Sequence, residues 1–305
     1  MAIDPQQLRL RHGDLLARCR FPAAGTAITC GVSGGADSIA LLVLAVAAGC
    51  EVTAVHVDHG LRDGSHLEAR WVAEVAARFG AGFRSERVEL EPGPNLEARA
   101  RSARLQVLGA SAALGHTADD RAETMLMNLL RGAGPDGLAG IRPGLRHPIV
   151  ALRRRETENV CTLEGIEPFL DPSNSDPAFL RNRVRHELLP LLQDLARRDA
   201  VPILVRQGEL FAEVADHLRH SANSIDVTDA HAVAGAEVVV ARVAVREWLR
   251  ADLPEAHPPD AATVERVLAV ARMESRSTDV GGGRRVERTA GRLRLVSPDD
   301  SVPVD

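Results

Sequence analysis

Short apolar runs alternate with longer stretches of helical periodicity between about Ala27 and about His147. The short runs are rich in apolar or β-branched residues, which is typical of strands; they are 27–32, 51–57, 83–90 and 111–116. The longer stretches place apolar residues at helical spacing; they are 38–48, 65–79, 95–108 and 119–130. Because strands and helices alternate, the pattern predicts an α/β fold with a doubly wound parallel sheet, Rossmann-like in organisation.

The pattern changes in the second half of the chain. Residues 132–148 are rich in glycine and proline and predict a loop, whereas 171–192 predict turns followed by an amphipathic helix. Further helical stretches lie near 202–222, 239–251 and 261–273. The segment 277–296 then predicts a small hairpin. We therefore expect two domains, an α/β domain over 1–199 and a smaller, mainly helical domain over 200–305.

Composition restricts both the core and the classes of partner. The 305 residues are 45% hydrophobic, but only 3% are aromatic and tyrosine is absent, so the core must be mainly aliphatic. The chain contains no lysine, so all 37 of its Lys and Arg positions are arginine. A net charge of −5 argues against a uniformly basic nucleic-acid binder but permits a local basic patch.

The cysteines and the N-terminal segment bear on redox chemistry and location. Cys19, Cys30, Cys50 and Cys161 form no C-x-x-C pair, and their spacing suits neither a zinc site nor a disulfide framework. Cys30 and Cys50 lie in or beside predicted apolar elements, which favours small buried side chains over reactive thiols. No apolar signal region or bilayer-length run is found, so we expect a soluble cytoplasmic protein with no membrane partner.

The most informative turn joins the first predicted strand to the next helix; its sequence is Ser33-Gly34-Gly35-Ala36-Asp37-Ser38. Glycines allow close backbone approach and a helix start directs N–H groups at an anion, so the turn suits a phosphate cradle. It also fits the G-x-S-x-G elbow of a hydrolase with Ser33 as nucleophile, but no HGGG-type motif precedes it. The G-x-G-x-x-G dinucleotide fingerprint is absent. A purely structural turn, capped by Ser33 or Asp37, is the remaining alternative.

Polar clusters also follow two other predicted strands. Asp58-His59-Gly60 follows the second strand, and 116–120 follows the fourth. The carboxyl ends of parallel strands meet at one edge of a sheet, where ligands bind, so these clusters should converge with the glycine turn. The turn lacks the lysine of a Walker loop, so phosphate charge must be neutralised by backbone N–H groups and Mg²⁺, which suits Asp37 as a metal ligand.

SGGADS matches the S-G-G-x-D-S signature of the PP-loop ATP pyrophosphatases, and further blocks resemble the tRNA(Ile)-lysidine synthetase family within them. These blocks are Val55–Arg62, Asn95–Arg101, Gly115–Thr124, Arg131-Gly132, Gly137–Ile141, Asp171–Asn174 and Arg181–Arg185. The resemblance is dense over about 27–195. Arg121 departs from the glutamine common in the family, and the spacer between Arg104 and His116 is short. No long C-terminal extension follows, so the chain resembles the compact form of the family.

The resemblance implies a ligase that forms a C–N bond. ATP would adenylate the C2 carbonyl oxygen of the wobble cytidine in tRNA(Ile) with a CAU anticodon, releasing pyrophosphate. The ε-amine of free L-lysine would then displace AMP and give lysidine. The resemblance thus makes 1–199 a PP-loop catalytic domain and 200–305 a region that contacts tRNA, and it suggests a homodimer.

Site residues follow by position in the motifs. The ATP-binding set is Ser33, Gly34, Gly35, Ala36, Asp37 and Ser38, with Asp37 also the Mg²⁺ ligand. Asp120 and Glu123 share a helix face at i, i+3, and the resemblance assigns this pair to lysine. A solvated helix start that favours acidic residues is the alternative. His116 would orient a phosphate or transfer a proton, or serve a structural role; with Asp37, Asp120 and Glu123 it completes the expected catalytic set.

Arginine clusters are the expected contacts to tRNA. Arg153-Arg154-Arg155 is one cluster, and a second consists of Arg181, Arg183 and Arg185, of which the first and last share a helix face. We place tRNA phosphate contacts on the second cluster, with a solvated helix face as the alternative. The rival functions are another PP-loop enzyme, such as a tRNA thiolase or an amidating synthetase, and a non-catalytic ATP-binding module.

Overall fold

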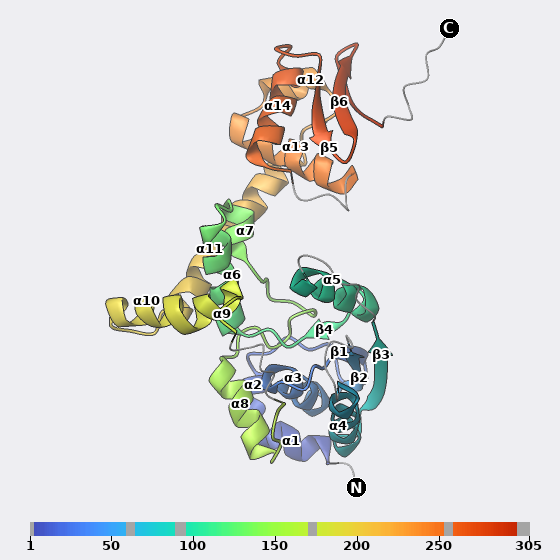
Figure 1. Cartoon of the computed structure of the whole chain (residues 1–305), viewed down its shortest axis with the longest axis vertical. Coiled ribbons are helices and arrows are strands. Elements are labelled where there is room, and N and C mark those ends of the chain that lie inside the picture. The colour runs from blue at the N-terminus through green and yellow to red at the C-terminus, as the bar shows by residue number, and fades with distance from the viewer. Residues whose placement is uncertain (1–2, 59–64, 89–95, 170–175, 253–258, 298–305) are drawn as a thin grey trace. The chain divides into compact units, whose positions relative to one another are not determined.

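The computed structural model describes residues 3–58, 65–88, 96–169, 176–252 and 259–297 (Figure 1). The chain forms two compact units, Met1–Leu210 and Phe211–Asp305, and the division falls within one helix, beyond the position 199/200 expected from the sequence. His59–Arg62, Asn95 and Asp171–Asn174 of the sequence motifs lie outside the described residues. Within the described part of the chain, no helix combines the length and apolar character needed to cross a membrane.

The first unit is built on a four-stranded parallel sheet in the order β3-β2-β1-β4. Its strands are β1 (Ala27–Gly31), β2 (Glu51–Asp58), β3 (Gly82–Arg87) and β4 (Ala113–Leu114). Its first helices are α1 (Pro5–Arg11), α2 (Gly13–Leu16), α3 (Ala36–Ala47), α4 (Ser65–Arg78), α5 (Leu96–Leu108) and α6 (Ala118–Leu130). These elements confirm the predicted α/β fold with a parallel sheet, since every strand of it is followed by a helix.

The remaining helices of this unit follow the sheet in the sequence. They are α7 (Pro135–Ala139), α8 (Arg154–Leu163), α9 (Leu180–Arg183), the π-helix η2 (Val184–Leu188), α10 (Leu189–Ala196) and α11 (Val201–Ala222), the last of which contains the unit boundary. The helix expected after the 171–192 turns therefore begins at Leu180. Two of these helices were not predicted: α7 lies in the expected loop, and α8 buries only Thr157, Val160 and Cys161, too few apolar positions for a clear period.

Helices cover both faces of the sheet, as a doubly wound arrangement requires (Figure 1). Val52 and Ala54 of β2 belong to the main core with α3 and α4, whereas Val55 packs with Leu108 of α5 in a separate cluster. This alternation follows from the period of two in a strand, which sends successive side chains to opposite faces. Helix α3 is buried over its whole length from Ser38 onward, because it lies between the sheet and other helices.

The second unit combines helices with a small antiparallel sheet. Its elements are α12 (Ala230–Gly235), α13 (Val238–Asp252), α14 (Ala261–Ala271), β5 (Ser277–Gly281), β6 (Arg284–Thr289) and β7 (Arg292–Val296). Val264, Leu268 and Val286 are among the buried residues that join the helices to the sheet. The predicted small hairpin is in fact a three-stranded sheet in the order β5-β6-β7. The mainly helical character expected for this region is otherwise present.

The cysteines have the structural role expected for Cys30 and Cys50. All four are unbridged, and Cys30, Cys50 and Cys161 are buried. Burial raises the pKa of Cys30 and of Cys161 to about 12, so neither thiol is a thiolate at neutral pH. In the described part of the chain, no group of three or more His, Cys, Asp or Glu side chains is arranged to hold a metal ion.

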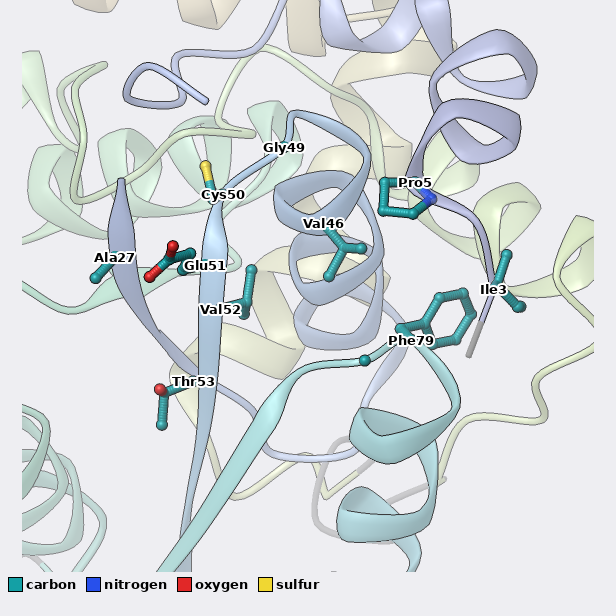
Figure 2. A pocket seen from close by; sticks show the side chains of 11 residues that line it. Ile3, Pro5, Ala27, Val46, Gly49, Cys50, Glu51, Val52, Thr53 and Phe79 are labelled. Atoms are coloured by element: carbon teal, nitrogen blue, oxygen red, sulfur yellow. The ribbon is translucent and has the colours of Figure 1, made fainter. Parts of the chain in front are cut away.

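A pocket of about 440 Å³ lies at the amino ends of β1 and β2 (Figure 2). Ala27, Glu51 and Phe79 are among the residues that line it. Ligands of open parallel sheets bind at the carboxyl ends of the strands, which is the opposite edge. The expected site therefore lies elsewhere in this unit.

Gly115 fixes the approach of β4 to the start of α3. A Cβ atom at this position would lie 2.6 Å from the Asp37 carbonyl oxygen and 3.0 Å from the Ser38 Cα. Both contacts are with backbone, which cannot move aside as a flexible side chain can. Only glycine therefore permits the observed distance between the two segments that carry the predicted site residues.

We expect Gly115→Ala to lower the free energy of unfolding by about 1–3 kcal/mol, because the added methyl group overpacks against backbone. Gly144→Ala is the matched control, since a Cβ there meets no atom within 4 Å and should change stability by less than about 0.5 kcal/mol. Urea unfolding of both variants measures the difference. Equal stabilities would show that the two segments separate without cost.

Candidate active site

The SGGADS turn forms a closed loop between β1 and α3. Ser38 Oγ donates to the Gly35 carbonyl at 2.8 Å and accepts from the Ser33 N–H at 3.1 Å. Gly34 has a φ of +89°, a conformation that favours glycine, and its carbonyl accepts from the Phe169 N–H at 3.0 Å. Gly35 is the N-cap of α3 and provides no side-chain acceptor. The Ser38 N–H donates to the Gly35 carbonyl at 3.0 Å, so the N–H groups of Ala36 and Asp37 are the ones directed at an anion.

The start of α6 is held by a capping box. Thr117 Oγ1 accepts from the Asp120 N–H at 3.4 Å, and Asp120 Oδ2 accepts from the Thr117 N–H at 2.8 Å. Asp120 is 7% exposed and Glu123 is fully buried. A solvated helix start is therefore not the environment of this acidic pair. Their positions at i, i+3 direct both carboxylates to the same side of α6, as the spacing predicts.

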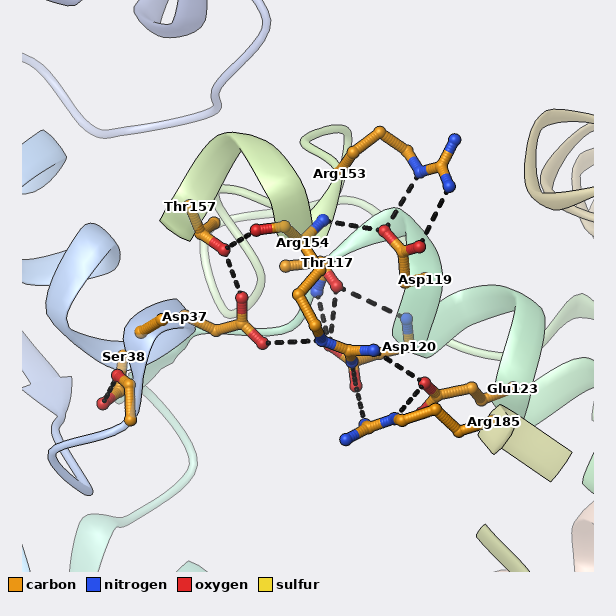
Figure 3. A network of polar contacts seen from close by, with 12 residues as sticks. Asp37, Ser38, Thr117, Asp119, Asp120, Glu123, Arg153, Arg154, Thr157 and Arg185 are labelled. Carbon is orange, nitrogen blue, oxygen red and sulfur yellow. Dashed lines mark hydrogen bonds and ion pairs between the residues drawn. The ribbon is translucent and has the colours of Figure 1, made fainter. Parts of the chain in front are cut away.

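One guanidinium, that of Arg154 at the start of α8, lies among three carboxylates (Figure 3). It approaches Glu123 at 2.9 Å, Asp120 at 3.1 Å and Asp37 at 3.4 Å. Asp37 also accepts a hydrogen bond from the hydroxyl of Thr157, one turn further along α8. The loop carboxylate and the acidic pair therefore converge, as expected from the carboxyl ends of neighbouring strands.

Two further arginines complete this network. Arg181 contacts Glu123 at 2.9 Å and Asp120 at 3.1 Å, and Arg185 contacts Glu123 at 2.7 Å. Arg183 lies apart from them and pairs with Glu187 on the exposed surface. The predicted shared face of Arg181 and Arg185 is therefore present, but in this structure both guanidiniums are paired with carboxylates of the site.

Asp37 is a carboxylate whose ionisation is disfavoured by burial. Burial raises its pKa to about 6, and the nearby Asp120 carboxylate adds to the increase. Arg154 and Thr157 act in the opposite direction but do not cancel it. A cation bound at Asp37 would therefore favour the ionised form that burial disfavours.

Glu123 has the opposite behaviour. Burial alone would raise its pKa, but the hydrogen bond from Arg185 and the charges of Arg154, Arg185 and Arg181 lower it to about 2. Its side chain is completely shielded from solvent, so the carboxylate is retained as an anion only because the arginines surround it.

The carboxylate of Asp119, at the start of α6, joins this helix to the start of α8. It accepts from the Arg153 side chain at 3.0 Å and from the Arg154 N–H at 2.8 Å. Arg153 also pairs with Asp199. The Arg153-Arg154-Arg155 run is thus not a uniform surface patch, because its first two members are engaged within the fold.

His116 lies beside a second histidine. Its Nδ1 is 3.0 Å from Nδ1 of His147, and the two rings meet edge to face with centroids 4.8 Å apart. In a hydrogen bond between two imidazole rings, one nitrogen donates and the other accepts. His147 lies in the segment 132–148, which was expected to be a loop, and the spacing of apolar residues in a loop does not predict its contact with His116.

Thr157 and Arg154 are the other site residues that the motifs did not single out. Arg154 was included in the sequence analysis only within a surface arginine cluster. A threonine one helical turn after an arginine, at i, i+3, was the available signal, but it requires knowledge of α8. The predicted members Ser33–Ser38, Asp120 and Glu123 lie together around this network.

Comparisons with known proteins agree with the geometry. Residues 11–192 match the family model described as the PP-loop domain. A tRNA(Ile)-lysidine synthase of Nocardia farcinica is 38% identical over 75% of this chain and 77% of its own length. A tRNA(Ile)-lysidine synthase of Salinispora tropica is 35% identical over 99% of both chains.

A solved structure shares the fold at low sequence identity. The tRNA thiolase NcsA of Methanococcus maripaludis matches with a TM-score of 0.56 and 14% identity, over 68% of this chain and 80% of its own. This likeness concerns the fold alone.

The low pKa of Glu123 gives a test of the network. A carboxylate whose pKa is lowered from 4.5 to about 2 on folding adds stability that is fully present above about pH 4.5 and is lost as the pH falls toward 2. The full contribution is about 3 kcal/mol. We expect Glu123→Gln to be less stable at neutral pH and to show a flatter loss of stability below about pH 4.5.

Urea unfolding from about pH 7 to about pH 3 measures this dependence. Glu187→Gln is the matched control, because it removes an exposed arginine pair whose contribution is small. Parallel pH curves for wild type and Glu123→Gln would contradict the assignment of acid sensitivity to Glu123.

Proposed function

Because this chain belongs to the tRNA(Ile)-lysidine synthase family, we propose that it ligates free L-lysine to C2 of the wobble cytidine of tRNA(Ile) with a CAU anticodon. The observation that carries the proposal is the acidic pair Asp120 and Glu123, which lies next to Asp37 of the PP-loop through a shared arginine. A phosphate site and a site for a cationic amine are thereby adjacent.

The reaction has two steps in this proposal. The C2 carbonyl oxygen of the cytidine attacks the α-phosphorus of ATP, and pyrophosphate leaves. The neutral ε-amine of lysine then attacks C2, and AMP leaves with the C2 oxygen. The first step converts the C2 oxygen, which is a poor leaving group, into part of AMP, which is a good one, and the second step expels that AMP.

The PP-loop residues Ser33, Gly34, Gly35, Ala36 and Ser38 would hold the pyrophosphate portion of ATP. Support comes from the closed loop and from the first-turn N–H groups of α3, which have no side-chain cap. No lysine is present to neutralise the phosphates, so the charge must be met by N–H groups, arginines and a cation.

Mg²⁺ fits the residues around Asp37. Mg²⁺ is commonly bound by one or two carboxylates together with substrate phosphates rather than by an all-protein cage. Asp37 supplies one carboxylate at the loop, and no three-residue His, Cys, Asp or Glu group is found among the residues with described positions. When bound, the ion would supply charge neutralisation at the phosphates.

Lysine would be recognised by Asp120 and Glu123. Two ionised carboxylates on one side of α6 are complementary to an ammonium group and not to a neutral side chain. The ε-amine must lose its proton before it attacks, since its ordinary pKa is about 10.4. His116, whose Nδ1 lies 3.0 Å from Nδ1 of His147, is our candidate for proton transfer or for orienting a phosphate.

Contacts to tRNA are proposed for Arg181, Arg183 and Arg185. Arg183 is on the exposed surface and is ready to meet a phosphate after leaving Glu187. Arg181 and Arg185 must first leave the acidic pair, so they suit RNA that reaches the site itself rather than the tRNA body. We further propose, from the family, a cytoplasmic homodimer in which residues 200–305 contribute to tRNA binding.

The three rival functions have less support. A thiolase that used its own cysteines would need a reactive thiolate, whereas burial holds the pKa of Cys30 and Cys161 near 12. An amidating synthetase or a non-catalytic ATP-binding module would not need an acidic pair beside the loop. The first experiment is therefore ATP–pyrophosphate exchange, which should depend on tRNA(Ile) only in the proposed enzyme.

We expect Asp37→Asn to abolish tRNA-dependent AMP formation while its circular dichroism spectrum is unchanged. The amide is nearly isosteric, but it lacks the charge needed to hold a cation at the phosphates. Single-turnover AMP release at saturating Mg²⁺ is the measurement. A rate within about twofold of wild type would remove Asp37 from the metal-binding role.

We expect Asp120→Asn and Glu123→Gln to raise the KM for lysine at least about tenfold and to change the KM for ATP by less than about threefold. Removing one carboxylate charge weakens a contact to the lysine ε-amino group that is made in both the ground and the transition state. Asp119→Asn is the matched control, because this neighbouring carboxylate binds the Arg153 side chain and the Arg154 main chain and belongs to neither proposed lysine-binding side chain. A rise confined to the KM for ATP would assign the pair to the nucleotide.

A further inference from the structure

The carboxylate of Glu123 is fully occupied by donors from this chain. Oε1 accepts from Arg154 at 2.9 Å and from Arg185 at 2.7 Å. Oε2 accepts from Arg181 at 2.9 Å and from Arg185 at 3.0 Å. Each carboxylate oxygen has two lone-pair sites, so all four sites of Glu123 are in use.

The carboxylate of Asp120 is occupied in the same way. Oδ1 accepts from Arg154 and from Arg181, each at 3.1 Å. Oδ2 accepts from the N–H of Thr117 at 2.8 Å and from its hydroxyl at 2.9 Å. The acidic pair proposed for lysine therefore has no acceptor site left for an ammonium group.

Charge leads to the same conclusion. Three guanidiniums surround three carboxylates, counting Asp37, so the network is neutral as a whole and offers little attraction to a further cation. An ammonium donates three hydrogen bonds and accepts none. Lysine can therefore bind at Asp120 and Glu123 only if an arginine leaves them.

In the enzyme without RNA, where Arg181 and Arg185 stay on the acidic pair, Arg154 is the arginine best placed to leave. Of the residues that the structure describes, it alone joins the acidic pair to Asp37 of the phosphate-binding loop, and guanidinium binds phosphate through two parallel hydrogen bonds. Its departure would free one lone-pair site on Oε1 of Glu123 and one on Oδ1 of Asp120. These two sites come from different carboxylates and face the position that the guanidinium had occupied.

We infer that Arg154 is exchanged between the acidic pair and a polyphosphate, so that lysine binds after the phosphate ligand has taken this arginine. The inference rests on the proposed function, because it takes Asp120 and Glu123 as the lysine site. It adds that lysine and ATP bind with positive coupling and that Arg154 is the specific link between their sites.

The test measures the Kd of L-lysine for the wild-type enzyme by calorimetry, with and without Mg²⁺ and α,β-methylene ATP, whose α–β bridge is not cleaved. We expect lysine to bind at least about tenfold more tightly with the nucleotide. An equal Kd in both conditions would overturn the exchange and leave the proposed function standing. No lysine binding in either condition would overturn both.

Two arginine variants locate the coupling. Arg154→Gln should bind lysine without nucleotide about as tightly as wild type does with it, and the nucleotide should add less than about twofold. Arg153→Gln is the matched control, because Arg153 pairs with Asp119 and Asp199, and it should retain the wild-type coupling. L-Norleucine, which has no ε-amine, should bind neither enzyme more tightly with nucleotide. Coupling that persists in Arg154→Gln would exclude Arg154 as the link.

Discussion

The placement of one guanidinium among three carboxylates is the interaction on which the rest of the site depends. Asp37, Asp120 and Glu123 would repel one another if they were brought together without a counter-charge, and burial would increase the cost. Arg154 supplies that charge from the start of α8, within 3.4 Å of each. The PP-loop and α6 therefore form one site only because a third segment, remote in sequence, lies between them. A buried group of this kind contributes more to defining the arrangement than to net stability.

Helices α6 and α8 position each other through consecutive residues. Asp119 accepts from the N–H of Arg154, at the start of α8, while Asp120 accepts from the side chain of the same residue. Asp120 also completes the capping box at Thr117, so one of its oxygens orders the backbone of α6 and the other serves the network. Structural and functional roles are thus divided between the two oxygens of a single carboxylate. The helix cap at Thr117 and the arginine network therefore both depend on Asp120.

Much of the fold was predictable because its signals are local. The period of the apolar residues located α3 and β2, and the SGGADS motif located the loop, since both depend on neighbours in sequence. Helix α8 gave no such signal, because it buries few apolar residues. The partners of Arg181 and Arg185 could not be predicted, because the sequence does not distinguish an arginine on the surface from an arginine that pairs with a distant carboxylate. The shared helix face of Arg181 and Arg185 was predicted correctly, but in this structure both guanidiniums donate to Glu123.

The close approach at Gly115 has a consequence for how the site can be redesigned. The close approach of the segment before α6 to the loop is set by main-chain contact at the Asp37 carbonyl, and no side chain takes part in it. Substitutions at Asp120 and Glu123 therefore leave this main-chain contact in place, although Asp120 also caps α6. Selection for a different amine would act on those side chains while Gly115 was held constant. Gly115 thus fixes the spacing of the two segments, whereas the side chains at positions 120 and 123 determine the charge of the site.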